Sequence, residues 1–128
     1  MFLTLAVSLG LILVVCGCVW HGSAPKRGGF MHTVVFWLKA GIPEDAADQI
    51  ADFYVRKVPS VTGVELVFVG RPAGTSREVV DNSYTVLSCL LFEDAAAQEA
   101  WQVDPVHDEF RESFGPWFES VVVYDTIH

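Results

Sequence analysis

Two histidines, His107 and His32, lie at sequence positions where an imidazole could act as a base or orient a ligand. His107 follows Asp104-Pro105, a pair that opens an expected helix, so its ring lies near the helix N-terminus. The positive end of the helix dipole lowers the pKa of a nearby imidazole and favours the neutral base. We therefore interpret His107 as a candidate general base. The alternative is a structural histidine that hydrogen-bonds the preceding loop and fixes the helix start.

The second candidate is His32, within the apolar segment 30–39. Strand alternation places its side chain on the same face as those of Val34, Phe36 and Leu38. Two interpretations stay open for this residue. His32 either orients an oxygen atom of a ligand or is a core histidine bonded to the backbone or to a partner side chain.

Metal and thiol chemistry are not expected. A zinc site needs three or four ligands at recognisable spacing. If His32 and His107 approach each other with Asp108 or Glu109 nearby, the set still lacks the two histidines that a metalloprotease motif places on one helical face. We therefore expect no tight metal and no cofactor. Cys89 has no basic sequence neighbour to activate its thiol, and we interpret it as a small buried hydrophobic residue.

Composition bounds the remaining possibilities. The chain has 128 residues, which is enough for one domain, and 52% of them are hydrophobic. An intrinsically disordered tail would be poorer in apolar residues. Sixteen acidic residues against eight basic ones give a net charge of -8, without the clustered positive charge that binding a nucleic-acid backbone requires. We therefore expect no nucleic-acid partner.

The N-terminus differs from the rest of the chain, because residues 2–20 contain no charged side chain. This stretch ends in Val15-Cys16-Gly17-Cys18, which resembles the lipobox of bacterial lipoproteins. The resemblance implies a signal peptide over residues 1–18, lipidation of Cys18, and a domain facing the periplasm or the cell exterior. The alternative is an uncleaved single transmembrane anchor, because no basic residue precedes the apolar stretch and Lys26 and Arg27 follow it. Residues 19–29 are predicted to be a linker.

The rest of the chain, residues 30–128, reads as one folded domain. Alternating β-branched and aromatic residues predict strands, and apolar residues at helical spacing predict helices. Pro43 suits a first helical turn, Pro59 a helix end, and Gly115-Pro116 a kinked or frayed last turn. The expected elements are a strand at 30–39, a helix at 43–58, strands at 64–70 and 84–92, helices at 94–102 and 105–119, and a strand at 120–127.

This β-α-β-β-α-β order predicts an α+β fold, a ferredoxin-like antiparallel sheet with helices on one face. A domain of this size leaves the other face of the sheet as an open apolar surface, and such surfaces mark interfaces. We therefore expect a homodimer with its two sheets face to face.

Three segments of the domain resemble the stress-responsive A/B barrel family, the dimeric α+β barrel proteins. They are the strand from His32 to Lys39, Pro59-x-x-x-Gly63-Val64 with Val69-Gly70-Arg71, and Phe92-Glu93-Asp94 followed by Ala100-Trp101 and Asp104-Pro105-x-His107-x-x-Phe110. The resemblance implies two chains that close their sheets into a barrel around a central cavity, with the face that carries His32 lining it.

Some members of that family are polyketide cyclases with a histidine at the position of His107 and a tyrosine six residues earlier. Here that earlier residue is Trp101, which can donate a hydrogen bond but cannot act as an acid. Tyr54 or Tyr84 is then a possible source of a hydroxyl.

The candidate catalytic residues are thus His107 and His32, and the candidate ligand-binding residues are Trp101, Phe36 and Tyr84. We expect a membrane-tethered dimer that binds a small, mostly apolar ligand in the barrel. The alternatives are a cofactor-free cyclase or lyase with His107 as base, and a purely structural dimer.

Overall fold

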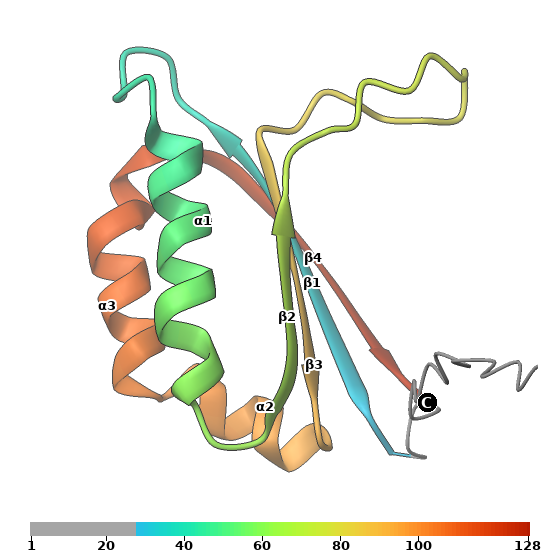
Figure 1. Ribbon diagram of the computed structural model, residues 1–128, viewed down its shortest axis with the longest axis vertical. Coiled ribbons are helices and arrows are strands. Elements are labelled where there is room, and N and C mark those ends of the chain that lie inside the picture. Colours follow the sequence, from blue (N-terminus) through green and yellow to red (C-terminus); the bar gives the residue numbers. More distant parts are fainter. Residues whose placement is uncertain (1–27) are drawn as a thin grey trace, which may run out of the picture.

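The computed structural model describes residues 28–128, which form a four-stranded sheet with helices on one side (Figure 1). The predicted signal segment at 1–18 and most of the predicted linker lie outside the described residues. The elements are β1 (Phe30–Leu38), α1 (Ala46–Lys57), β2 (Val64–Gly70), β3 (Val86–Phe92), α2 (Ala95–Gln102), α3 (Pro105–Phe114) and β4 (Phe118–Ile127), with short 3₁₀ turns at Val58–Ser60 and Gly115–Trp117. The predicted ferredoxin-like α+β class is confirmed.

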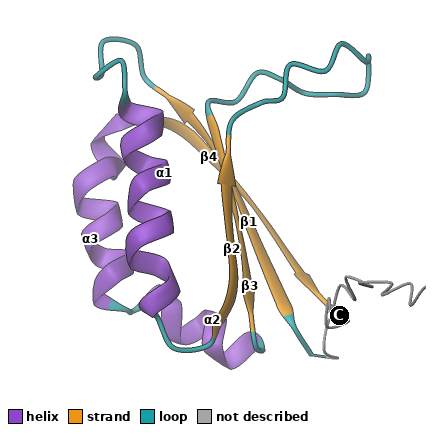
Figure 2. Cartoon of the chain, viewed as in Figure 1, coloured by secondary structure: helices purple, strands orange, loops and turns teal. Residues whose placement is uncertain are grey.

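The sheet has the strand order β2-β3-β1-β4, and every neighbouring pair is antiparallel. In the register, His32 lies opposite Leu90 on β3 and Asp125 on β4. Because side chains alternate between faces, His32 shares its face with Val34 and Phe36. Figure 2 shows that all three α-helices cover this face and leave the other uncovered.

The core lies between the helices and the face of the sheet that carries His32. Helix α1 contributes Ile50 and Tyr54, which are spaced one turn apart and are both buried. Helix α3 contributes Phe110, whose ring contacts Phe36 at 5.9 Å and Tyr54 at 5.0 Å between centroids. This aromatic contact holds α3 over β1, the strand that carries His32.

Several element boundaries differ from the sequence prediction. Helix α1 begins at Ala46, because Pro43 starts a separate turn in which its carbonyl accepts from the amide of Ala46 at 3.1 Å. Strand β3 begins at Val86, and the preceding Thr85 also contacts β1, since its amide donates to the Phe36 carbonyl at 2.9 Å and its hydroxyl accepts the amide of Leu38 at 3.2 Å. Helix α3 ends at Phe114 rather than at residue 119, and β4 begins at Phe118. Pro116 lacks an amide hydrogen and cannot continue the helix.

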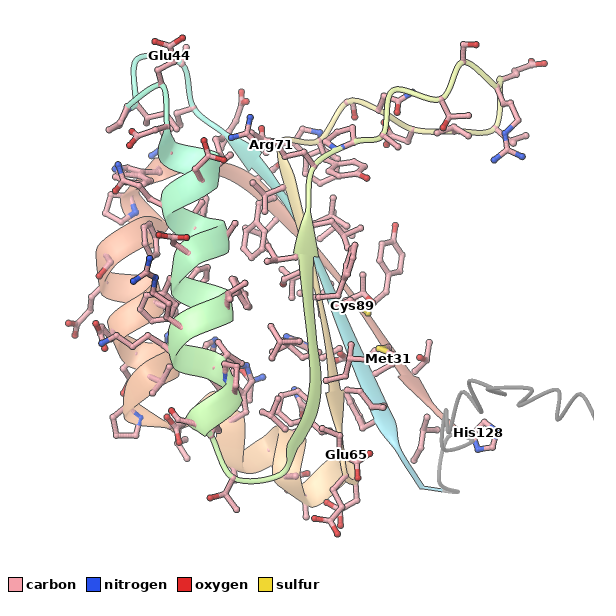
Figure 3. All side chains as sticks on the ribbon, viewed as in Figure 1. Met31, Glu44, Glu65, Arg71, Cys89 and His128 are labelled. Carbon is pink, nitrogen blue, oxygen red and sulfur yellow. The ribbon has the colours of Figure 1, made fainter. Side chains whose placement is uncertain are left out.

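The uncovered face of the sheet is apolar. Figure 3 shows Met31 and Cys89 on the side of the sheet away from the helices. Cys89 is half-buried and its thiol donates to the sulfur of Met31 at 3.0 Å, so the expectation of a buried Cys89 is wrong for the single chain. Its side chain points out of the helix-covered core because Cys89 is one residue out of phase with the buried Ser88 and Leu90. None of the helices within residues 28–128 has the length and apolarity that crossing a bilayer requires.

Gly63 fixes the contact between the turn before β2 and helix α2. Its φ is +85°, and a Cβ placed there would lie 2.5 Å from the Cβ of Ala97. Gly74 has a similar φ of +71° but nothing within 4 Å of such a Cβ. The two glycines therefore share the backbone constraint, and only Gly63 also has a close neighbour.

We expect Gly63→Ala to destabilise the domain more than Gly74→Ala. Both variants carry the backbone strain of a left-handed conformation, about 1–2 kcal/mol, and Gly63→Ala adds overpacking of about 1–3 kcal/mol. Urea unfolding of both variants and of the wild type measures the difference. Equal losses of unfolding free energy in the two variants would show that α2 shifts freely away from Gly63.

Candidate functional site

A pocket of about 350 Å³ lies between the sheet and helix α3. It opens beside β4, the edge strand that the helices leave exposed. The lining side chains are mostly apolar or aromatic, with a few polar groups among them. They come from β1 (His32, Val34, Phe36), α1 (Tyr54), the end of α2 (Trp101, Gln102), α3 (His107, Phe110, Arg111), and Gly115, Phe118, Val121 and Val123. Both candidate histidines therefore line one pocket.

The position of this pocket corrects one expectation. The resemblance implies that the face carrying His32 lines a central cavity between two sheets. In the structure that face is covered by the chain's own helices, because Val34 and Phe36 pack in the core beneath them. The pocket is therefore formed within one chain.

His32 is held by a carboxylate on the neighbouring strand. Its Nδ1 lies 2.6 Å from Oδ1 of Asp125, and the imidazole is 7% exposed. A carboxylate only accepts, so Nδ1 carries the hydrogen in this bond. The Asp125 bond therefore engages only Nδ1 of His32, and Nε2 is the other ring nitrogen of this pocket-lining residue. His32 is thus a core histidine bonded to a partner side chain, and it also lies on the wall of the pocket.

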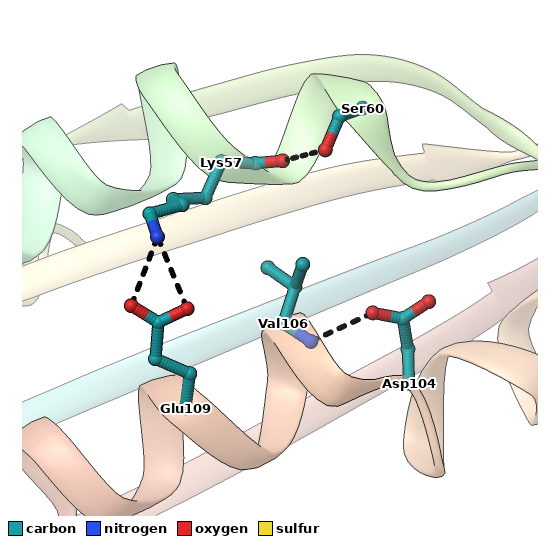
Figure 4. Close-up of polar contacts among 5 residues, drawn as sticks. All are labelled: Lys57, Ser60, Asp104, Val106 and Glu109. Atoms are coloured by element: carbon teal, nitrogen blue, oxygen red, sulfur yellow. Dashed lines mark hydrogen bonds and ion pairs between the residues drawn. The ribbon is translucent and has the colours of Figure 1, made fainter.

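His107 is positioned by the start of helix α3. The Oδ1 atom of Asp104 accepts the amide of Val106 at 2.8 Å, which caps the helix, and Pro105 occupies the first helical position. Glu109 forms an ion pair with Lys57 at 3.0 Å, which ties α3 to the end of α1 (Figure 4). These contacts fix the turn of the helix that carries His107.

The ring of His107 has two further contacts. Its Nδ1 lies 3.2 Å from the carbonyl oxygen of Gln102, and its plane packs on Trp101 with a centroid separation of 4.6 Å. A carbonyl accepts, so Nδ1 is the protonated nitrogen of the neutral ring. The basic nitrogen is then Nε2, which has no hydrogen-bond partner within the described part of the chain. The hydrogen bond to the preceding loop that a structural His107 would make is therefore present, and it does not involve Nε2.

The pKa of His107 lies below its ordinary value of 6.5. Partial burial disfavours the imidazolium and is the largest cause, and the positive charges of Arg111 and His32 act in the same direction. The Gln102 carbonyl and Asp108 oppose the shift. The lowered pKa agrees with the predicted direction, and burial is its largest cause.

Tyr54 also lines this pocket, and its hydroxyl lies against the buried Ser88. Its side chain is 3% exposed, and burial raises the pKa of its phenol well above the ordinary value of 10, against a smaller opposing effect of the neighbouring Ser88 hydroxyl. The phenol therefore stays protonated at neutral pH and can donate a hydrogen bond. Ser88 Oγ itself is buried and makes no hydrogen bond of normal geometry.

The candidate ligand-binding residues separate into two groups. Phe36 and Trp101 both line the pocket. Tyr84 does not, because it lies in the loop before β3 rather than on the strand, so its assignment to this pocket is wrong. Of the two tyrosines considered from the sequence, Tyr54 is the one that reaches the pocket.

Two charged residues were missed from the sequence. Asp125 shares a strand face with Val121 and Val123, and this alternation could have marked it as a partner for His32 once the β1–β4 register was known. Arg111 follows His107 by four residues on one helix, a spacing that places two side chains on one face.

The acidic residues near His107 are engaged elsewhere. Asp108 forms an ion pair with Arg111, and Glu109 pairs with Lys57. Within residues 28–128 no group of three histidine, cysteine or acidic side chains is gathered that could hold a metal ion.

Residues 30–128 match the family model of the Stress responsive A/B Barrel Domain (Dabb). The protein belongs to this family. The match spans β1 to the end of β4, and so includes every side chain of the pocket. No curated protein matches the sequence.

Solved structures share the Dabb fold at low sequence identity. Hydroxynitrile lyase from Passiflora edulis has a TM-score of 0.70 and 21% identity, over 80% of this chain and 95% of that one. A dimeric ferredoxin-like protein of unknown function from Thermobifida fusca has a TM-score of 0.69 and 14% identity, over 80% and 93%. A Dabb family protein from Mesorhizobium loti has a TM-score of 0.64 and 22% identity, over 80% and 98%. These similarities show the fold.

The electrostatics of the Dabb pocket predict the titration of His107. We expect the ring to titrate below pH 6.5, and Arg111→Gln to raise its pKa because a positive neighbour is removed. NMR chemical shifts of the imidazole, followed from pH 8 to pH 4, measure both values. Arg56→Gln is the matched control, because Arg56 is an exposed helical arginine on α1 outside this pocket. A wild-type value at or above 6.5 would contradict the assignment.

Proposed function

We propose that the pocket binds a small, mostly apolar molecule and that His107 moves a proton on it without a cofactor. The observation that carries this proposal is the state of His107: a neutral imidazole with Nδ1 occupied by a carbonyl and Nε2 free, on the wall of an apolar pocket. A base of this kind is typical of general acid–base catalysis.

The size of the pocket supports ligand binding. Ligand pockets have volumes of about 300–1,000 Å³, and this one has about 350 Å³. Val34, Phe36 and Phe118 offer apolar surface to the body of a ligand. Tyr54 and His32 offer the few polar contacts that would orient an oxygen atom of the ligand.

A lyase step can be written with these groups. For a cyanohydrin, Nε2 of His107 takes the hydroxyl proton, the carbon–oxygen bond becomes a carbonyl, and the carbon–cyanide bond breaks with its electron pair leaving on cyanide. The imidazolium of His107 then returns the proton to cyanide, which leaves as hydrogen cyanide. The protonated phenol of Tyr54 donates a hydrogen bond to the substrate oxygen. The hydroxynitrile lyase from Passiflora edulis has the same fold, and this similarity motivates the choice of a lyase over a cyclase.

We expect the full-length protein to cleave mandelonitrile, followed as benzaldehyde absorbance after subtraction of the spontaneous reaction. His107→Gln should lower the rate by about 10²–10⁴-fold, the usual contribution of a general base. His128→Gln is the control, because His128 lies at the end of the chain and outside this pocket. A wild-type rate equal to that of buffer, or an unchanged rate in His107→Gln, would reject the lyase.

The second candidate is a binding protein without chemistry, which the mostly apolar lining favours. It predicts that His107→Gln keeps its affinity for apolar probes and that no probe is turned over. The melting temperature separates it from the purely structural alternative, because a ligand that binds the native state raises the melting temperature, and the rise grows with the logarithm of the ligand concentration once it exceeds the Kd.

A homodimer through the uncovered sheet face belongs to the same proposal. Phe68 and Tyr124 project from that face and are each 60% exposed, next to Leu66 and Val122. Similar folds from Thermobifida fusca and Bacteroides fragilis are described as dimeric. Sedimentation of the full-length protein tests this, and Phe68→Asp should shift it towards monomer.

Membrane attachment through the N-terminal segment also belongs to the proposal, and it is motivated by the lipobox-like residues ending at Cys18. Lipidation predicts a mature chain that begins at Cys18 with an added lipid mass. An uncleaved anchor predicts the full-length mass in the membrane fraction. Mass spectrometry of the membrane-bound protein distinguishes them.

A further inference from the structure

The ionisable side chains that line the pocket include basic residues but no acidic ones. The chain carries 16 acidic residues, yet none of them lines this pocket. The ionisable side chains that line it are His32, Tyr54, His107 and Arg111. Of these only Arg111 carries a fixed charge at neutral pH, and that charge is positive.

Arg111 lies where a ligand would enter. It follows His107 by one helical turn on α3, so the two side chains share a face of the helix. Its side chain is 60% exposed, whereas the deeper wall at Phe36 is 2% exposed. Arg111 is therefore at the exposed end of the pocket lining, and with Asp108 and Glu112 it also lines a neighbouring hollow on the surface.

The Arg111 guanidinium has more N–H donors than its ion pair with Asp108 uses. Its Nη2 donates to Oδ1 of Asp108, a pair in which both side chains are about half exposed. A guanidinium has five N–H donors in a planar fork, so most of them stay available to a second acceptor. Exposed ion pairs contribute little to stability and exchange readily for another anion. Asp108 is therefore a competitor for Arg111 rather than a barrier to binding.

We infer that the pocket takes a small amphipathic carboxylic acid, with its carboxylate on Arg111 and its apolar body between α3 and strands β1 and β4. The planar fork of arginine matches a carboxylate in a bidentate arrangement. One guanidinium balances one negative charge, whereas a phosphate monoester carries about -1.5 to -2. The inference rests on the proposed function for the proton step, since it places the reacting part of the acid beside His107, one turn from its carboxylate.

The test uses two soluble probes of nearly the same shape, phenylacetate and the neutral phenylacetamide. Binding to the full-length protein in lipid nanodiscs is measured by titration calorimetry, with empty nanodiscs as the blank. We expect phenylacetate to bind about tenfold or more tightly than phenylacetamide, because a hydrogen bond to a charged group contributes that much. Arg111→Gln should abolish this preference without changing the affinity for phenylacetamide.

Two matched variants complete the test. Arg56→Gln removes an exposed, ion-paired helical arginine outside this pocket and should leave the preference unchanged. Asp108→Asn frees the guanidinium and should tighten phenylacetate alone. Equal wild-type affinities, no binding of either probe, or an equal loss in Arg56→Gln and Arg111→Gln would each overturn the inference.

The outcomes also separate this inference from the proposed function. Phenylacetate binding that depends on Arg111, without mandelonitrile cleavage, supports the carboxylate site and rejects the lyase step. Cleavage that depends on His107, with no preference for phenylacetate, keeps the proton chemistry and rejects the carboxylate site.

Discussion

The packing of Phe110 determines where the pocket lies. Its ring contacts Phe36 on β1, Phe53 and Tyr54 on α1, and Phe118 at the start of β4, with centroid separations from 5.0 to 5.9 Å. These contacts press α3 onto β1 and leave the exposed strand β4 without a helix above it. The pocket beside α3 therefore has exposed residues of β4 on one side and the buried rings of Phe36 and Phe110 on the other. Moving Phe110 would move His107, which lies one turn earlier on the same helix.

Both histidines of the pocket are held through Nδ1 by a neighbouring acceptor. Asp125 holds His32 through Nδ1, and the carbonyl of Gln102 holds His107 through Nδ1. Gln102 lines the pocket and Asp125 does not, so the partner that belongs to the pocket wall is a neutral carbonyl rather than a carboxylate. In an apolar pocket a neutral base is favoured, because burial penalises the imidazolium.

Sequence reasoning found the fold because the alternation of 30–39 and the helical spacing of Ile50 and Tyr54 each have one physical interpretation. It found His32 and His107 because both stand at positions with a clear orientation on a strand or at a helix start. It missed Asp125, whose role depends on the β1–β4 register, a long-range property that local patterns do not carry. It placed Tyr84 on the third strand, whereas Tyr84 precedes β3 and does not line the pocket, because local alternation does not reveal where pairing with β1 begins.

Trp101 occupies a position on the pocket wall beside His107 and has no acidic group. The sequence comparison with polyketide cyclases assigns a tyrosine to that position, and an indole cannot replace its acidity. Trp101 instead packs against the ring of His107 and orients it. Tyr54 on α1 also lines the pocket, and burial raises the pKa of its phenol, which is therefore protonated at neutral pH. On the pocket wall His107 combines a ring nitrogen that has no hydrogen-bond partner in the described part of the chain with a lowered pKa.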